Sequence, residues 1–260
     1  MKNNQINGFE VFTFEQFSFP KIPHGFFTRN GGISPVPWES LNLSTTGGDS
    51  RENVIENRKR IFEIINRPVD SLFDAWQVHG NRIIQVNQPR GLENSPEKAD
   101  GLVTNKESIT LFLRFADCVP ILLYDPVKRV VGIFHAGWKG TLRKIVKRGV
   151  NVFRDDYNSN VNDIVAGIGP SICAAHYEIK DDVATLVRKT FKTRTDDVLS
   201  ASKSGIHFDL AKANQIILEQ SGITKIEFSD ICTACDTRKW FSHRAENGAT
   251  GRFGAYIAVQ

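Results

Sequence analysis

The stretch Thr110–Thr141, TLFLRFADCVPILLYDPVKRVVGIFHAGWKGT, decides the fold because it combines strand signals with a helix start. Its three apolar runs have the length of buried strands and cover residues 110–115, 119–124 and 130–134. The dipeptide Asp125-Pro126 is typical of a turn between the second and third runs. A glycine-bearing turn then leads into an amphipathic helix over 142–153. Such a succession of strands and helices predicts an α/β or α+β fold.

Strand and helix patterns continue on both sides of this stretch. Further helices are expected from a cap at Asp49 or Ser50 to about Asn66, over 181–191 and over 210–221. Further strands are expected in two aromatic-rich runs and in six later ones, namely 9–19, 25–28, 82–86, 101–104, 163–168, 206–208, 225–231 and 253–259. We therefore predict one layered domain over residues 1–260, with mixed β-sheets flanked by helices.

Composition restricts the class of protein. The chain has 260 residues with 40% hydrophobic and 24% charged residues, which is ordinary for a globular protein, and no apolar run is long enough for a membrane helix. The polar N-terminus has no signal-peptide pattern, so we expect a soluble cytoplasmic protein without membrane contact. The net charge of +4 is spread among acidic residues and gives no support to nucleic-acid binding. The sequence leaves open whether the protein is a monomer or a homodimer.

Three residues form a candidate metal site. Cys118 and His135 stand at the ends of two apolar runs, and they would face each other if those strands pair around the Asp125-Pro126 turn. His79 lies in a turn beside Gly80. A catalytic zinc takes three protein ligands and leaves its fourth position to water or substrate. His79, Cys118 and His135 could be such a set.

The same residues allow two other interpretations. Cys118 could be a thiolate nucleophile with His135 as its base, or both could be ordinary core residues. Asp117 fits either mechanism, as a carboxylate that orients the site or as a general base. The residues alone do not choose between these possibilities.

Several basic and polar residues are candidates for substrate contact. The turn Ala136–Thr141 leads into a helix and could bind a phosphate with the help of Lys139, although a turn that simply packs is as compatible with the pattern. Arg29 and Asn42 lie in predicted loops. Arg244 and the nearby Arg252 could present charge to an anionic substrate or belong to a solvated turn.

The remaining cysteines show little pattern. Cys232 and Cys235 form a C-x-x-C pair, which could be a redox pair or half of a zinc site. No second C-x-x-C and no thioredoxin-like pattern accompany it, so we interpret the pair as structural. Cys173 has no spacing signature, and neither do the other histidines, which are His24, His176, His207 and His243.

Eight short segments together resemble a known family. They are, in order, FTR at 27–29 with Gly31-Gly32, SLNL at 40–43, QVHG at 77–80, ADCVP at 116–120, HAGWKGT at 135–141, GPSI at 169–172, FDL at 208–210 and CT at 232–233. From about Gly25 to the C-terminus the chain resembles the YfiH-type laccase-domain proteins, also called polyphenol oxidases or purine nucleoside phosphorylases. It departs from the common Ser-Tyr-Arg-Arg of the family at 242–245, which reads Ser-His-Arg-Ala.

The resemblance implies a fold, an activity and a site. The implied fold is similar to a bacterial toxin deamidase domain, and the implied metal is zinc, or copper in its place, held by His79, Cys118 and His135. The implied activity is phosphorolysis of adenosine, inosine and S-methyl-5'-thioadenosine, with adenosine deamination as a second activity. The substrate and phosphate contacts that we infer from it are Arg29, Asn42, Lys139 and Arg244, with Asp117 beside the metal ligands.

Three other functions compete with this one. A multicopper polyphenol oxidase needs histidines in H-x-H pairs, whereas the six histidines here form none, and the single methionine is Met1. A cysteine-dependent amide hydrolase, for example one that edits peptidoglycan precursors, is the stronger rival. A binding module without catalysis would leave an open three-ligand metal site without a purpose. Loss of activity to a chelator would support the metal enzyme, whereas resistance to a chelator with loss to a thiol alkylator would support the hydrolase. A binding module would show neither effect.

Overall fold

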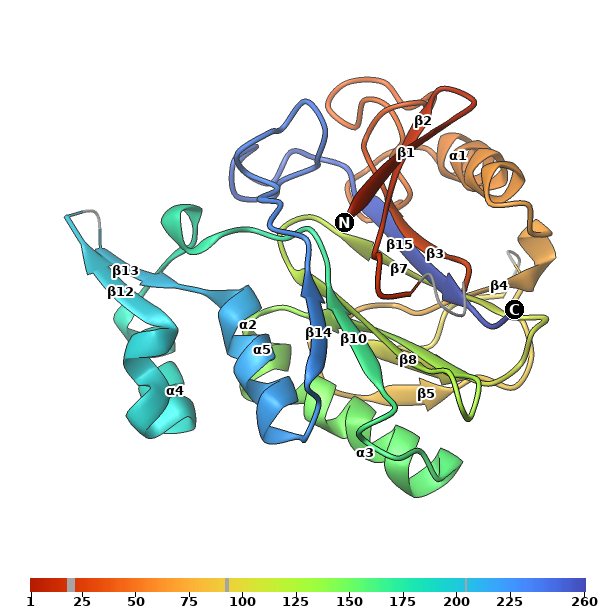
Figure 1. Ribbon diagram of the computed structural model, residues 1–260. Helices are drawn as coiled ribbons and strands as arrows, with labels where there is room; N and C mark the ends of the chain where they lie inside the picture. Colours follow the sequence, from red (N-terminus) through yellow and green to blue (C-terminus); the bar gives the residue numbers. More distant parts are fainter. Residues whose placement is uncertain (18–21, 92–93, 204) are drawn as a thin grey trace.

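The structure is a computed structural model that describes all residues except 18–21, 92–93 and 204. In the described residues the strands form two six-stranded sheets and one three-stranded sheet (Figure 1). The strand order of the first sheet is β1 (Lys2–Ile6), β2 (Phe9–Thr13), β3 (His24–Phe27), β15 (Phe253–Ala258), β7 (Thr110–Phe115) and β4 (Leu72–Asp74). The order of the second is β14 (Lys225–Phe228), β10 (Val165–Ile168), β8 (Val119–Asp125), β9 (Val130–Ala136), β6 (Gly101–Thr104) and β5 (Ile83–Gln85). The third contains β11 (Glu178–Ile179), β13 (Gly205–Phe208) and β12 (Leu199–Ser202).

The helices lie outside the two large sheets. The α-helices are α1 (Arg51–Ile64), α2 (Trp138–Leu142), α3 (Ile145–Tyr157), α4 (Asp181–Phe191) and α5 (Leu210–Gln220). The short 3-10 helices are η1 (Val69–Ser71), η2 (Ala174–His176) and η3 (Lys192–Asp197). In Figure 1, α1 lies on one side of the stacked sheets and α2, α3 and α5 lie on the other, while α4 and the three-stranded sheet project to the left.

Side-chain alternation along the strands explains this layering. Leu111 and Leu113 of β7 pack with Leu122 of β8 and Ile133 of β9 in a core between the two large sheets. The residue between the two leucines, Phe112, points to the opposite face and packs under α1. Successive strand residues face opposite sides of a sheet, so each run of apolar residues serves two cores at once.

The outer face of the second sheet has its own core. Ile121 and Phe134 pack there against an apolar stripe of α3 that includes Val146 and Phe153, and α5 contributes to the same core. The layers are therefore stacked in the order helix, sheet, sheet, helix. The predicted mixed fold of helices and mixed sheets is confirmed.

The hairpin at the centre of the second sheet forms as predicted. β8 and β9 pair in antiparallel fashion, and Pro120 lies opposite His135. The Asp125 carboxylate accepts hydrogen bonds from the backbone N–H groups of Val127 and Lys128 at 2.8 and 3.0 Å, which fixes the turn. Cys118 and His135 are consequently placed at the same end of this hairpin.

Some predicted boundaries were wrong. The helix expected over 142–153 is divided, because Lys144 takes a left-handed conformation with φ of 55° between α2 and α3. After this turn, the apolar stripe of α3 packs on β9. The strand expected over 225–231 ends at Phe228. The run predicted over 9–19 forms β2, and its last two residues lie outside the described part of the chain.

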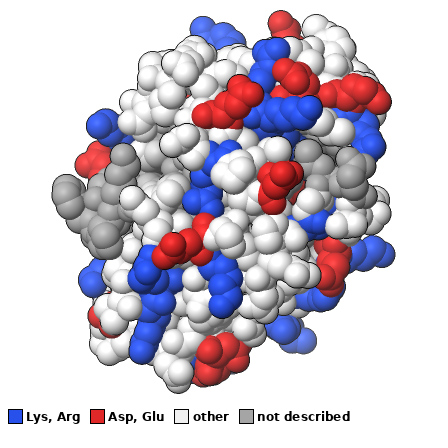
Figure 2. All heavy atoms as spheres, turned by 90° about the vertical axis from the view of Figure 1, so that its right-hand side faces the viewer, with Lys and Arg blue, Asp and Glu red and all other residues white. Residues whose placement is uncertain are grey.

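Two further expectations concern the surface. Within the described ranges, no helix has the length and apolar character needed to cross a lipid bilayer. On the face shown in Figure 2, Lys and Arg side chains are interspersed with Asp and Glu. Nucleic-acid-binding surfaces typically gather basic side chains into a stripe or patch, and this face shows both signs of charge mixed together.

Candidate active site and metal centre

Three segments bring the predicted ligand set together. His79 lies in the turn after β4, Cys118 lies in the break between β7 and β8, and His135 lies near the end of β9. Their ligand atoms all lie within 4.8 Å of one another, and the Cys118 Sγ is 3.9 Å from the His79 Nδ1. One thiolate and two imidazoles are donors that zinc and copper accept. The donor set and its spacing fit such an ion.

Asp100 supports two of these ligands, and the sequence analysis missed it. Its carboxylate is fully buried, at 0% exposure, and one oxygen lies 2.8 Å from the Nδ1 of His135. The same carboxylate accepts hydrogen bonds from the backbone N–H groups of His79 at 2.9 Å and Gly80 at 2.7 Å. A carboxylate behind a histidine ligand fixes the ring orientation. Asp100 therefore sets both the His135 ring and the His79 turn.

The backbone at His79 needs this support. His79 has a φ of 56°, in the left-handed region that a residue with a side chain adopts at a cost of about 1–3 kcal/mol. The hydrogen bonds from the turn to Asp100 stabilise that conformation. Burial raises the pKa of Asp100, but hydrogen bonding and the charge of His135 lower it below its usual value. The carboxylate is thus ionised and able to accept these bonds.

The thiol of Cys118 is prepared for metal binding or nucleophilic attack. Burial raises its pKa, but the charge of His135 and hydrogen bonds to His135 and His79 lower it to about 6. Burial lowers the pKa of His135, whereas the Cys118 thiolate and Asp100 raise it to about 9. Both shifts favour the thiolate form of Cys118, which is the form that binds metals and attacks electrophiles.

Gly137 lets the ligands approach each other. A Cβ atom at this position would lie 2.9 Å from the Sγ of Cys118 and 2.9 Å from the Nδ1 of His79. Its φ of −75° is open to any residue, so the glycine is required by the space and not by the backbone angle. The absence of a side chain here keeps a pocket between the thiol and the imidazole.

The change Gly137→Ala is expected to weaken metal binding about 10- to 100-fold, the range found when groups that orient metal ligands are lost. The added methyl group must displace the Cys118 thiol or the His79 ring. Competition with a chromophoric chelator measures the affinity. Unfolding in the presence of chelator serves as the control, because the metal-free variant should be about as stable as the metal-free wild type. Unchanged affinity would show that the space at Gly137 is not used by the ligands.

Asp117 is bonded to the C-terminal part of the chain. Its carboxylate accepts hydrogen bonds at 2.7 Å from the hydroxyls of Thr233 and Ser242 and from the backbone N–H of Arg244. The residue also has a φ of 86°, which directs the chain sharply into Cys118. Because three donors occupy the carboxylate, this geometry favours the orienting role over the general-base role.

The three ligand residues open onto a cleft of about 800 Å³. Its lining includes basic side chains, which are Arg114, Lys139, Arg244 and Arg252, and aromatic side chains, which are Trp76, Trp138 and Tyr177. Two of the four predicted substrate residues, Lys139 and Arg244, therefore face this space. The guanidinium of Arg244 is held over the Tyr177 ring at 4.9 Å and donates to the carbonyl of Glu178 at 2.9 Å.

Arg29 and Asn42, the other two predicted contacts, lie behind the cleft and are not among its lining residues. Arg29 forms an ion pair with Glu246 at 2.8 Å, and its guanidinium lies 4.3 Å from the centre of the Phe241 ring. Asn42 is fully buried and accepts a hydrogen bond from the backbone N–H of Arg252 at 2.9 Å. These contacts indicate that both residues support the loops around the cleft.

The comparison with protein families agrees with this site. Residues 23–260 match a family model described as multi-copper polyphenol oxidoreductase laccase. The chain belongs to this laccase family. The metal-ligand candidates and the cleft all lie within the matched part of the laccase-family chain.

Relatives of the laccase-family chain include proteins that are named as phosphorylases and not as oxidoreductases. It is 37% identical over 244 residues to the purine nucleoside phosphorylase YlmD of Bacillus subtilis, covering 91% of this chain and 88% of that protein. The structure of the hypothetical protein YfiH of Bacillus licheniformis superposes with a TM-score of 0.91 at 34% identity, covering 99% and 97% of the two chains. That of YlmD from Geobacillus stearothermophilus gives 0.87 at 33% identity, covering 91% of each. The names of the phosphorylase relatives support an enzyme.

Proposed function

We propose that this chain is a metal-dependent purine nucleoside phosphorylase that acts on adenosine, inosine and S-methyl-5'-thioadenosine, with adenosine deamination as a second activity. One observation carries the proposal: a basic, aromatic-lined cleft ends on the cluster of His79, Cys118 and His135. The relatives named purine nucleoside phosphorylase support the same activity.

The aromatic lining suits a purine base. Trp76 is 53% exposed although it is a large apolar side chain, and it borders the cleft together with Trp138 and Tyr177. Exposed aromatic rings next to a cavity typically stack on planar ligands. The cleft volume also lies within the range of small-molecule sites, about 300–1,000 Å³. We assign these rings to the base and the neighbouring cations to the phosphate.

Lys139 and Arg244 are the side chains that we assign to phosphate. Among the residues that the structure describes, no carboxylate forms an ion pair with Lys139, whose Nζ lies 5.4 Å from the centre of the Trp138 ring. Its charge is therefore available to an anion in the cleft. Arg244 is already oriented by Tyr177 and Glu178, so binding a phosphate costs it little conformational freedom.

His79, Cys118 and His135 would hold the metal. When bound, zinc supplies a Lewis acid that can polarise a substrate oxygen or activate water. The residues around it keep the site in shape, since Asp100 orients His135 and Asp117 holds the Cys118 loop against the segment that carries Arg244. Phosphorolysis would then join a phosphate oxygen to the ribose C1' while the bond from C1' to the purine breaks.

Product analysis tests the proposal. Purified protein is incubated with adenosine or inosine, with and without phosphate, and the free base, ribose 1-phosphate and inosine are measured. Phosphate-dependent release of base and ribose 1-phosphate, lost on chelation, supports the phosphorylase, and phosphate-independent conversion of adenosine to inosine supports the deaminase. Activity on amides that resists chelators and is lost to a thiol alkylator would support the cysteine hydrolase instead, and oxidation of phenols by the copper-loaded protein alone would support the oxidase.

The change Lys139→Ala is expected to raise the KM for phosphate about 10- to 100-fold, because a hydrogen bond to a charged group contributes about 1.5–3 kcal/mol. The KM for the nucleoside should change much less. Initial rates over a range of phosphate concentrations measure the effect. Lys147→Ala is the matched control, since Lys147 is exposed on α3 and does not line the cleft. Equal phosphate KM values in all three proteins would remove Lys139 from the phosphate site.

A further inference from the structure

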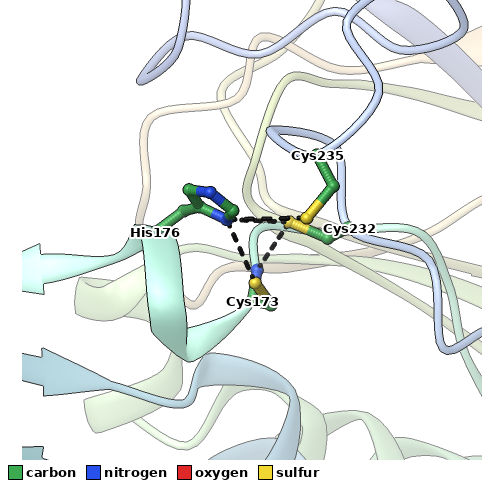
Figure 3. A group of neighbouring side chains, drawn as sticks. All are labelled: Cys173, His176, Cys232 and Cys235. Carbon is green, nitrogen blue, oxygen red and sulfur yellow. Dashed lines mark hydrogen bonds between the residues drawn. The ribbon is translucent and has the colours of Figure 1, made fainter.

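A second cluster of metal-binding residue types lies apart from the cleft ligands. It contains Cys173, His176, Cys232 and Cys235, whose ligand atoms all lie within 4.8 Å of one another. Cys173 immediately precedes η2 and His176 ends it, after β10, and the other two residues follow β14. Figure 3 shows the three sulfur atoms and the imidazole directed toward one another. The cluster shares no residue with the site of His79, Cys118 and His135.

The distances within this cluster match tetrahedral coordination. The Nδ1 of His176 lies 3.3 Å from the Sγ of Cys173, 3.6 Å from that of Cys235 and 3.7 Å from that of Cys232. Zinc bonds of about 2.3 Å to sulfur and 2.0–2.1 Å to nitrogen place a nitrogen and a sulfur roughly 3.6 Å apart in a tetrahedron. One nitrogen is therefore spaced from three sulfurs as a single central ion requires.

We propose that Cys173, His176, Cys232 and Cys235 bind a structural zinc ion. Three cysteines and one histidine are a donor set of closed structural zinc sites, in which the protein fills all four positions. The chain supplies them as two short-spaced pairs, a Cys and a His three residues apart and a C-x-x-C, and short spacing within each pair is common in such sites. The proposal does not depend on the function assigned to the cleft.

A backbone contact supports the sulfur of Cys232 as a ligand atom. The backbone N–H of Cys173 donates to the Sγ of Cys232 at 3.3 Å. Hydrogen bonds of this kind to ligand atoms orient and stabilise them in metal sites. Cys173 and Cys232 are half-buried, and Cys235 is exposed.

A disulfide is the main alternative use of these sulfurs. Cys173, Cys232 and Cys235 are free thiols in the structure, as is Cys118 in the cleft. A disulfide would join two of the three sulfurs and give no reason for the third sulfur or for an imidazole nitrogen at similar distances from all three. A zinc ion accounts for all four side chains at once, and the geometry therefore favours the metal.

The site would fasten two loops beside the cleft. β10 and β14 are parallel neighbours, and Ser171 and Cys232 continue their pairing beyond the strands. Cys232 precedes Thr233, which bonds to Asp117, and His176 precedes Tyr177, which lines the cleft. An ion at this point would hold the wall that contains Tyr177 against the segment that supports Asp117.

Metal analysis of variants tests the proposal. Zinc per chain is measured by elemental analysis on protein purified with a thiol reductant and without chelator. We expect one zinc ion to remain in Cys118→Ala, in which the cleft set is broken, and none in the double variant Cys118→Ala/Cys235→Ser. Cys235 is exposed, so serine should be tolerated by the fold. A Cys118→Ala protein without zinc, or a double variant that keeps it, overturns the site.

Cobalt and stability give a second, independent readout. Cobalt-substituted Cys118→Ala should show the strong visible absorption of a tetrahedral ion bound by thiolates, and its unfolding temperature should fall on chelation. The double variant should lack the absorption and should unfold at the same temperature with and without chelator. If Cys235→Ser prevents folding, the Cys118→Ala protein alone decides. If mass spectrometry finds a Cys232–Cys235 disulfide in the Cys118→Ala variant although it was purified with a thiol reductant, the proposal is also overturned.

Discussion

Replacing Cys118 with alanine should abolish binding of metal in the cleft and reduce the proposed phosphorolysis by about a thousand-fold or more, because Lewis-acid stabilisation by a metal is worth several kcal/mol. Cys118 supplies the thiolate of the ligand set, and its Sγ lies 3.9 Å from the His79 Nδ1. Turnover is followed by release of free base at saturating phosphate. The loss of metal from the cleft is measured as the difference in metal content per chain between the variant and the wild type.

A second substitution separates a ligand from a nucleophile. Cys118→Asp keeps a side chain that can bind zinc but removes the sulfur. If Cys118 is a ligand, the aspartate variant should retain part of the metal and part of the turnover, whereas alanine retains neither. If Cys118 is a nucleophile, both variants should be inactive and the wild type should resist chelators. The second result would transfer support to the cysteine hydrolase.

The change Asp74→Asn should lower the free energy of unfolding by about 3–5 kcal/mol, the cost of removing one partner from a buried ion pair. Asp74 is 1% exposed and pairs with three arginines, at 3.2 Å from Arg58, 2.5 Å from Arg90 and 2.9 Å from Arg114. Asparagine would leave these guanidinium groups without their counter-charge. Because Arg114 also lines the cleft, activity should fall as well.

The same change should alter the acid dependence of stability. Burial raises the pKa of Asp74, but the charges of Arg114, Arg58 and Arg90 lower it below its usual value. The folded-state pKa of Asp74 therefore lies below the unfolded-state value of about 3.9. The contribution of Asp74 to the free energy of unfolding is complete above the unfolded-state pKa and is lost as the pH falls through the folded-state pKa. The difference between wild type and variant should shrink below about pH 4.

Denaturant unfolding at pH 7 and at several acidic pH values measures both effects. Asp155→Asn is the control, because Asp155 forms an exposed ion pair with Arg154. Exposed pairs typically contribute about 0–1 kcal/mol, so this variant should unfold close to the wild type. Equal unfolding midpoints for Asp74→Asn and Asp155→Asn would show that the arginine cluster does not need its carboxylate.

The sequence predicted the parts of the site that depend on local structure. The apolar runs and the Asp125-Pro126 turn predicted the β8–β9 hairpin, and the hairpin places Cys118 and His135 at one end. Short-range turn chemistry and strand alternation act over a few residues, so they can be identified without knowledge of the tertiary fold. Lys144 shows the limit, because nothing in the helical pattern indicates the left-handed residue that separates α2 from α3.

Two sets of contacts that depend on distant strand pairing were not predicted. Asp100 immediately precedes β6, and nothing in the sequence around it indicates that it orients His135 across the β6–β9 pair. Cys173 and Cys232 meet because β10 and β14 run in parallel and their following loops leave the same edge. The pattern at Cys232 and Cys235 was visible, but its partners depend on a sheet order that spacing does not determine.

The position of β15 affects how the molecule can be made. This strand, Phe253–Ala258, lies between β3 and β7 in the middle of the first sheet and pairs with both. During synthesis, β3 and β7 leave the ribosome long before their shared neighbour exists, so until then they have unpaired edges. Thr233, Ser242 and Arg244 also arrive late, and Asp117 has none of these partners before then. A nascent chain therefore depends on the segment from Thr233 to β15 both to complete the first sheet and to supply the partners of Asp117 beside Cys118.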